Sequence, residues 1–182
     1  MKKILQFINA IAIVLPFTLT AESQSASDAA LLTSANILQT IKSIPLSAAV
    51  DQPLRTLDVG TANVGIFLVH RPQEPDQGCT IEHDTLVNDN TTSIFFVLDG
   101  AGTLVTGGTL TNPTPLSSDD PDLKLVGRGS RDSGIRNGHS RHIHKGDIVV
   151  IPAGIPHGFS AIEKSIMYEV VRIDSGKILP VK

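Results

Sequence analysis

The sequence predicts an all-β protein, a sandwich or barrel of strands preceded by one helix. Short apolar stretches alternate with turns rich in Gly, Pro, Asn and Asp along most of the chain, which is typical of such folds. Aromatic residues make up only 4% of the chain and Trp is absent, so Ile, Val and Leu, residues that favour strands, must fill the core. A length of 182 residues with 41% apolar side chains is enough for one domain with a real core.

The first 21 residues read as an export signal. Two lysines precede an apolar run at residues 4–19 that is interrupted by polar residues and a proline, a pattern too short and too broken for a typical membrane span. We predict cleavage after Ala21, with a later cut near Ala26 as the alternative; a retained anchor or a buried helix is the competing interpretation. The mature chain would then be periplasmic or extracellular, with no stable membrane span.

Removal of residues 1–21 takes away two lysines and no acids, so the formal net charge changes from −3 to −5. An acidic mature chain argues against nucleic acid as a partner.

Cys79 is the only cysteine, so packing rather than an internal disulfide must hold an exported chain together.

Residues 27–44 are predicted to form the helix. Ser27 or Asp28 can cap its start and Pro45 follows its end. Apolar residues recur near helical spacing along it, at Leu31, Leu32, Ile37, Ile41 and Ile44.

The predicted strands start near residues 54, 63, 79, 93, 102, 140, 147 and 165. Residues 109–137, rich in Gly, Pro, Ser and Asp, are predicted to be a long surface loop. With no internal repeat in the sequence, we expect an N-terminal helical segment at 22–53 and one β-barrel domain at 54–182.

The stretch GDIVVIPAGIPHGF, which begins at Gly146, contains a specific motif. Two prolines fix much of the backbone between two strands. Gly146, Pro152, Gly154 and His157 match the spacing of the second motif of the cupin superfamily, with Ala161 in place of its final Asn. The chain therefore resembles a single-domain cupin, which implies a jelly-roll β-barrel with the N-terminal helix added.

The first cupin motif is degenerate. Counting back from Gly100, the position of the family's glutamate holds Ser93. His83 can take the role of the second histidine if the hairpin contains an insertion, but the first histidine is then replaced by Ile81. The resemblance therefore implies two of the usual metal ligands, His83 and His157.

Imidazole ligands are compatible with several divalent metals, and the ligand set alone does not identify which of Fe, Mn, Ni, Cu or Zn is bound. Cys79 would share the inner face of a regular strand with His83, and Asp89 is a candidate carboxylate from the turn. The competing interpretations are a surface histidine near a hairpin for His83 and a small buried apolar residue for Cys79.

The other histidines are weaker candidates. His142 and His144, with His139 nearby, would face one side of a strand and form a rival metal site, but we favour a solvated strand edge. His70 ends a strand before a Pro-rich turn, and we predict a rim position for it.

The predicted pocket has an apolar wall. If Ser93 faces inward, so do Phe95 and Val97, beside His157 and Phe159. The pocket residues are therefore Cys79, Ser93, Phe95 and Phe159. For Tyr168, Glu169 and Arg172 the alternation is too uniformly apolar to say which side chain points inward.

Two functional classes follow. One is an exported protein that binds a small molecule in its pocket and has no assigned catalytic activity. The other is a metal-dependent enzyme of the cupin dioxygenase or isomerase type, in which His157, His83 and a further ligand hold the metal. The resemblance also implies a homodimer.

Overall fold

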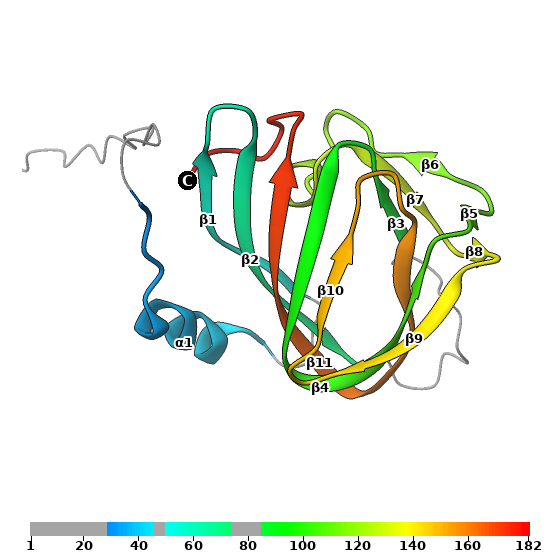
Figure 1. The fold of residues 1–182 in the computed structure, drawn as a ribbon, viewed down its shortest axis with the longest axis horizontal. Coiled ribbons are helices and arrows are strands. Elements are labelled where there is room, and N and C mark those ends of the chain that lie inside the picture. Colours follow the sequence, from blue (N-terminus) through cyan, green and yellow to red (C-terminus); the bar gives the residue numbers. More distant parts are fainter. Residues whose placement is uncertain (1–28, 46–49, 74–84) are drawn as a thin grey trace, which may run out of the picture.

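The structure is a computed structural model that describes residues 29–45, 50–73 and 85–182. Its main feature is a curved antiparallel sheet that closes into a barrel, with a helix beside it (Figure 1). The predicted all-β jelly-roll class with an N-terminal helix is confirmed. No helix in the described ranges has the length and apolar character needed to cross a bilayer.

The helix α1 (Ser34–Ser43) begins later than predicted. Its cap is Thr33, because the Asn36 amide donates to the Thr33 hydroxyl at 3.2 Å and the Thr33 amide donates to the Asn36 side chain at 3.3 Å. The predicted caps, Ser27 and Asp28, lie outside the described residues. No residue of α1 is buried.

Two long strands form the centre of the sheet, β4 (Thr91–Thr106) and β11 (His157–Asp174), paired along almost their whole length. On its other edge β4 pairs with β10 (Ile148–Ile151) and β9 (His139–His144). The second half of β11 pairs with β2 (Asn63–Pro72), which pairs in turn with β1 (Val50–Asp58). The strand β1 thus begins four residues before the predicted start of the barrel domain.

The barrel closes because β4 and β11 both bend. The register of β11 against β4 shifts at three places between Phe159 and Tyr168, and such irregularities allow one strand to belong to two sheets. Gly100 lies opposite Ile166 at this corner and has a φ of 78°.

The predicted long surface loop at 109–137 is wrong as a description of this segment. It contains β5 (Thr109–Leu110), β6 (Thr114–Pro115), α2 (Leu123–Val126), β7 (Gly129–Asp132) and β8 (Ile135–Arg136). β7 pairs with β3 (Thr85–Asn88) and with β6. These pairings give the backbone N–H and C=O groups of the segment hydrogen-bond partners within the protein, where a free loop would bond to water. The Gly, Pro, Ser and Asp content of residues 109–137 therefore did not predict this strand pairing.

The rim position predicted for His70 is also wrong. His70 is only 1% exposed. It lies between Val50 of β1 and Met167 of β11, so β2 has neighbours on both edges at this point. The strand also continues beyond His70 to Pro72. The sequence predicted strands near residues 54 and 165 but did not show that they flank this one.

The core occupies the inside of the barrel. Its buried apolar side chains come mainly from β2, β4 and β11, with one residue from the C-terminal segment, Leu179. Along β4 the residues alternate between buried and partly exposed, so the buried Ser93, Phe95 and Val97 share the inner face.

Candidate functional site

A cavity of about 430 Å³ opens into the barrel interior. Its size is within the range of sites for small organic molecules. Its described lining combines charged, aromatic and aliphatic side chains from β1, β2, β3, β4, β7 and β11, and from α2 with its N-cap residue. These residues are Asp51, Arg71, Thr85, Leu86, Phe95, Leu104, Asp122, Leu125, Val126, Arg131, His157, Gly158, Phe159, Tyr168 and Arg172.

His157 lies at the cavity wall because of the turn before β11. Gly146 and Gly154 have φ values of 95° and 78°, a region that glycine adopts at low cost. This explains two of the fixed positions in the second motif. His157 itself is 9% exposed and pairs with both Leu86 of β3 and Thr106 of β4.

The ring of His157 has a defined orientation. Its Nδ1 lies 2.9 Å from the carbonyl oxygen of Ile155. Because a carbonyl oxygen only accepts hydrogen bonds, Nδ1 carries the hydrogen and Nε2 carries the lone pair of the neutral ring. The Phe95 ring lies edge-on to the imidazole, with 6.2 Å between centroids.

An aromatic wall forms next to His157. The rings of Phe95 and Tyr168 stack at 4.5 Å between centroids, and Phe159 lies 5.9 Å from Tyr168. Phe95 and Phe159, both expected in the pocket from the sequence, line the cavity. Ser93 is 2% exposed on the same inner face but is not among the lining residues.

A second wall carries charge. Asp51 lies between two guanidinium groups: its Oδ1 is 2.7 Å from Nη2 of Arg71 and its Oδ2 is 2.8 Å from Nη2 of Arg172. All three side chains are largely buried, at 10%, 17% and 7% exposure respectively. Burial raises the pKa of Asp51, but the two arginines outweigh this effect and hold the pKa below its ordinary value.

Sequence reasoning missed Asp51, Arg71 and the contribution of the 109–137 segment. Arg71 follows Phe67 and Val69 at alternate positions, so the period of the strand contained a signal that it faces inward. Tyr168 and Arg172, left undecided from the sequence, both line the cavity, whereas Glu169 does not. Asp122 and Arg131 had no such signal, because turn-rich composition does not predict tertiary placement.

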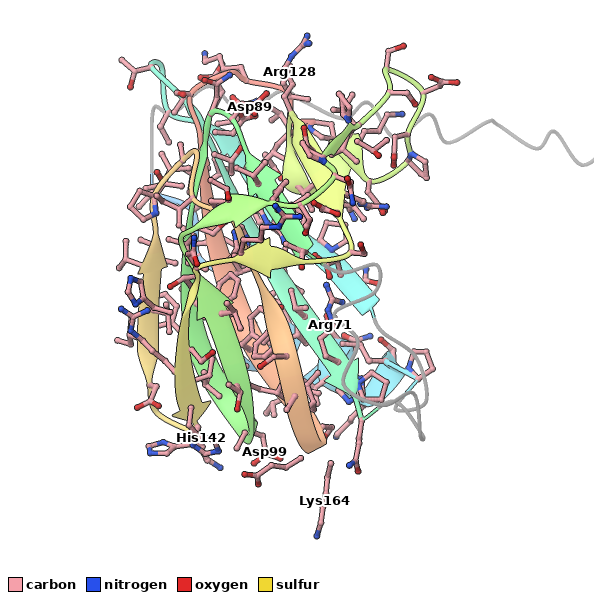
Figure 2. All side chains as sticks on the ribbon, turned by 90° about the vertical axis from the view of Figure 1, so that its right-hand side faces the viewer. Arg71, Asp89, Asp99, Arg128, His142 and Lys164 are labelled. Atoms are coloured by element: carbon pink, nitrogen blue, oxygen red, sulfur yellow. The ribbon has the colours of Figure 1, made fainter. Side chains whose placement is uncertain are left out.

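The remaining candidates lie elsewhere. His83 and Cys79 lie outside the described residues. Asp89 is exposed in the turn between β3 and β4 and does not line the cavity. Figure 2 shows it with Arg128 at one end of the barrel, far from Arg71, so the suggested role for its carboxylate in the pocket is wrong.

The rival histidine cluster is at the opposite end of the barrel, where Figure 2 shows His142 near Asp99. His142 lies 2.9 Å from a carboxylate oxygen of Glu163, and the two side chains are 52% and 66% exposed. His144 is 64% exposed beside Asp147. These two histidines of β9 therefore form solvent-exposed pairs, His142 with Glu163 of β11 and His144 with Asp147 of the following turn.

The described part of the cavity does not fit a divalent metal. Outside the masked ranges, no group of three or more His, Cys, Asp and Glu side chains is placed to hold an ion. Both aspartates of the cavity already pair with arginines, Asp51 with Arg71 and Arg172, and Asp122 with Arg131. Three guanidinium groups in the wall also disfavour a cation electrostatically.

Comparison with known proteins identifies the family. A family model described as Cupin matches residues 85–178, whereas no curated protein matches the chain. A Bacillus halodurans structure has 12% identity and a TM-score of 0.45, covering 82% of this chain and 85% of that one. An RmlC-like cupin family protein with a double-stranded β-helix fold, from Methanocaldococcus jannaschii, has 13% identity and a TM-score of 0.41, with coverage of 70% and 82%.

The DMSP lyase DddQ from Ruegeria pomeroyi DSS-3 has 15% identity and a TM-score of 0.37 over 60% of this chain, which spans only 38% of the lyase. These structural likenesses are too distant to bear on activity. The family model spans about half of the sequence, and it includes the second motif and the turn that positions His157. The chain belongs to the cupin family.

Proposed function

We propose that this protein is an exported cupin that binds a small organic molecule in the barrel cavity. The observation that carries the proposal is the cavity itself, with a volume of about 430 Å³ and an aromatic wall facing buried charged groups. A concave site that combines aromatic and aliphatic side chains with placed polar groups is a common form of ligand site.

A blocking substitution tests the cavity. Leu86 of β3 lines the cavity, whereas its neighbour Val87 does not. We expect wild-type protein to enhance the fluorescence of the neutral apolar dye N-phenyl-1-naphthylamine, since apolar surface removed from water stabilises binding. Leu86→Trp should reduce the enhancement at least tenfold, because the indole fills the cavity.

Val87→Trp is the matched control and should keep the enhancement, since it adds the same side chain outside the cavity. Circular dichroism melting of both variants reports whether they fold. Equal dye binding by the two folded variants would contradict a cavity site.

The alternative function is a metal-dependent enzyme of the dioxygenase or isomerase type. Its specific support is the orientation of His157, whose Nδ1 is anchored to Ile155 so that Nε2 has the lone pair that a metal ligand needs. Any further ligands would come from outside the described residues, where His83 and Cys79 lie.

Metal content separates the two functions. We expect protein purified without a chelator or an affinity tag to contain less than about 0.1 metal ion per chain by elemental mass spectrometry, because two or more protein ligands are needed for retention. His157→Ala should then leave the metal content unchanged. One metal ion per wild-type chain that is lost in His157→Ala would favour the enzyme instead.

Export and homodimerisation complete the proposal. Export is supported by the lysines and apolar run of residues 1–19, and a homodimer by membership of the cupin family. Cell fractionation with intact mass measurement tests cleavage after Ala21. Light scattering of the exported chain tests the dimer, and a monomeric mass would exclude it.

A further inference from the structure

The outer face of the main sheet has a second apolar surface. The strands β1, β2, β11, β4 and β10 lie side by side in that order (Figure 1). Their inward side chains form much of the core and part of the cavity wall. An antiparallel sheet that covers a core on one face normally has polar side chains on the other, where it meets water.

One row of outward residues crosses four strands without a polar side chain. Val171 of β11 lies opposite Ile66 of β2 on one side and Ile94 of β4 on the other. Ile94 in turn lies opposite Val150 of β10. Because Ile94 alternates with the buried Phe95 along β4, this row faces away from the core. It forms an apolar stripe on the outside of the barrel.

Neighbouring rows widen this stripe. Phe96 lies opposite Ile148 of β10, and Ile173 is the next outward residue after Val171 on β11. Ile148, Val150 and Ile173 are 61%, 59% and 39% exposed, and no other strand residue in the described ranges is a large apolar side chain with such exposure. The outer apolar patch consists of Ile66, Ile94, Phe96, Ile148, Val150, Val171 and Ile173.

A charged residue lies within the patch. Glu169 of β11 is opposite Leu68 of β2 and Phe96 of β4, so its neighbours across both strands are apolar. Burial raises the pKa of this carboxyl group above its ordinary value. The carboxylate is therefore already partly removed from water in a single chain, and a surface placed over the patch would remove it further.

The outer face is large enough for a specific contact. Its five strands lie about 4.8 Å apart and contribute about six residues each at about 3.3 Å per residue, which gives an area of about 500 Å². Two such faces together bury about 1,000 Å², the size at which specific protein interfaces begin. Monomeric proteins seldom leave an apolar face of this size open to water unless it has a binding role.

Building on the homodimer of the proposed function, we propose that the outer apolar patch packs against the same patch of a second copy of this chain. A two-fold axis needs only one self-complementary patch, and a second copy is a partner whose matching surface the structure itself contains. Stacked sheets lie about 10 Å apart with their facing side chains interdigitated. The cavity lies on the other face of the same strands.

Sedimentation velocity of the purified protein tests the contact. We expect a dimer with a dissociation constant of about 100 μM or tighter, as for a small specific interface. Val150→Asp should weaken the dimer at least tenfold, because the contact would bury a charge without a partner. Ile148→Lys should have the same effect, since an apolar contact excludes charges of either sign.

Two further variants complete the design. Val59→Asp is the matched control, because Val59 is 45% exposed in the turn between β1 and β2 and lies outside the patch. It should dimerise as wild type does. Glu169→Gln removes the partly dehydrated charge and should tighten the dimer at least threefold. Circular dichroism melting reports whether each variant folds, and substitutions at such exposed positions usually change stability little.

The outcomes separate this inference from the function on which it rests. A monomer at about 100 μM would overturn both the contact and the homodimer. A dimer that folded Val150→Asp and Ile148→Lys form as tightly as wild type would overturn the patch and leave the homodimer. An unchanged or weaker dimer in Glu169→Gln would show that the carboxylate stays in water, against a covered patch. Dye binding tests the cavity independently of all three.

Discussion

Replacing Asp51 with asparagine is expected to lower the free energy of unfolding by about 3–5 kcal/mol at pH 7, the range measured when one partner of a buried ion pair is removed. The substitution removes the carboxylate that contacts both Arg71 and Arg172 in the cavity wall. It also cuts the link between β1 and β11, which joins residues 121 positions apart. Urea unfolding followed by circular dichroism measures the loss.

The advantage of wild type over Asp51→Asn should depend on pH in a defined direction. Burial raises the pKa of Asp51, but Arg172 and Arg71 more than reverse this, so the folded-state pKa lies below the ordinary value of 3.8. The stabilisation is therefore complete above pH 3.8 and is lost as the pH falls through the lower folded-state pKa. The two unfolding curves should converge only in that acidic range.

Asp99→Asn is the matched control for this experiment. Asp99 lies 3.7 Å from Lys145 at the barrel end, and both side chains are more than 70% exposed, so solvent screening makes the pair weak. The control should unfold near the wild-type midpoint at every pH. A loss as small for Asp51→Asn as for Asp99→Asn would mean that the two arginines have adequate partners without Asp51.

The second large effect is expected at the corner of the barrel. A Cβ atom added to Gly100 would lie 2.0 Å from the carbonyl oxygen of Ser165, and the φ of Gly100 is 78°. An alanine must adopt a left-handed backbone at a cost of about 1–2 kcal/mol and must also displace β11, at about 1–3 kcal/mol for overpacking. We expect Gly100→Ala to lower the free energy of unfolding by about 2–5 kcal/mol, the sum of these ranges.

Gly154→Ala isolates the backbone contribution. Gly154 has the same φ of 78°, but a Cβ there would meet nothing within 4 Å. We expect it to lose about 1–2 kcal/mol, and the difference between the two variants measures the clash with β11. Equal losses in chemical denaturation would show that the corner adjusts to the methyl group without cost.

The fold class and the family were predictable from local features. The alternation of short apolar stretches with turn residues indicates strands, and the spacing from Gly146 to His157 needs only a short chain segment to be recognised. The positive φ values of Gly146 and Gly154 give that spacing its physical basis. The period of two along β4 likewise placed Phe95 and Val97 on the inner face before any tertiary contact was known.

The cavity was only partly predictable. His157, Phe95 and Phe159 follow from strand alternation near a motif, but Asp122 and Arg131 come from a segment whose composition indicates a loop. This segment is held to the sheet by backbone hydrogen bonds between β7 and β3. Every residue type except proline can form such bonds, so the residue types do not show where the pairing occurs. Composition alone therefore does not specify that this segment lines the barrel.

The sequence by itself determined the class of fold, the rigid turn before His157 and the apolar faces of the long strands, because each depends on residues close together in the chain. Only the tertiary structure decided that Asp51 sits between Arg71 and Arg172 beside Thr85 and an aromatic wall. These groups come from strands far apart in sequence. Closing the barrel fixes their separation, and no local propensity or spacing encodes a distance across it.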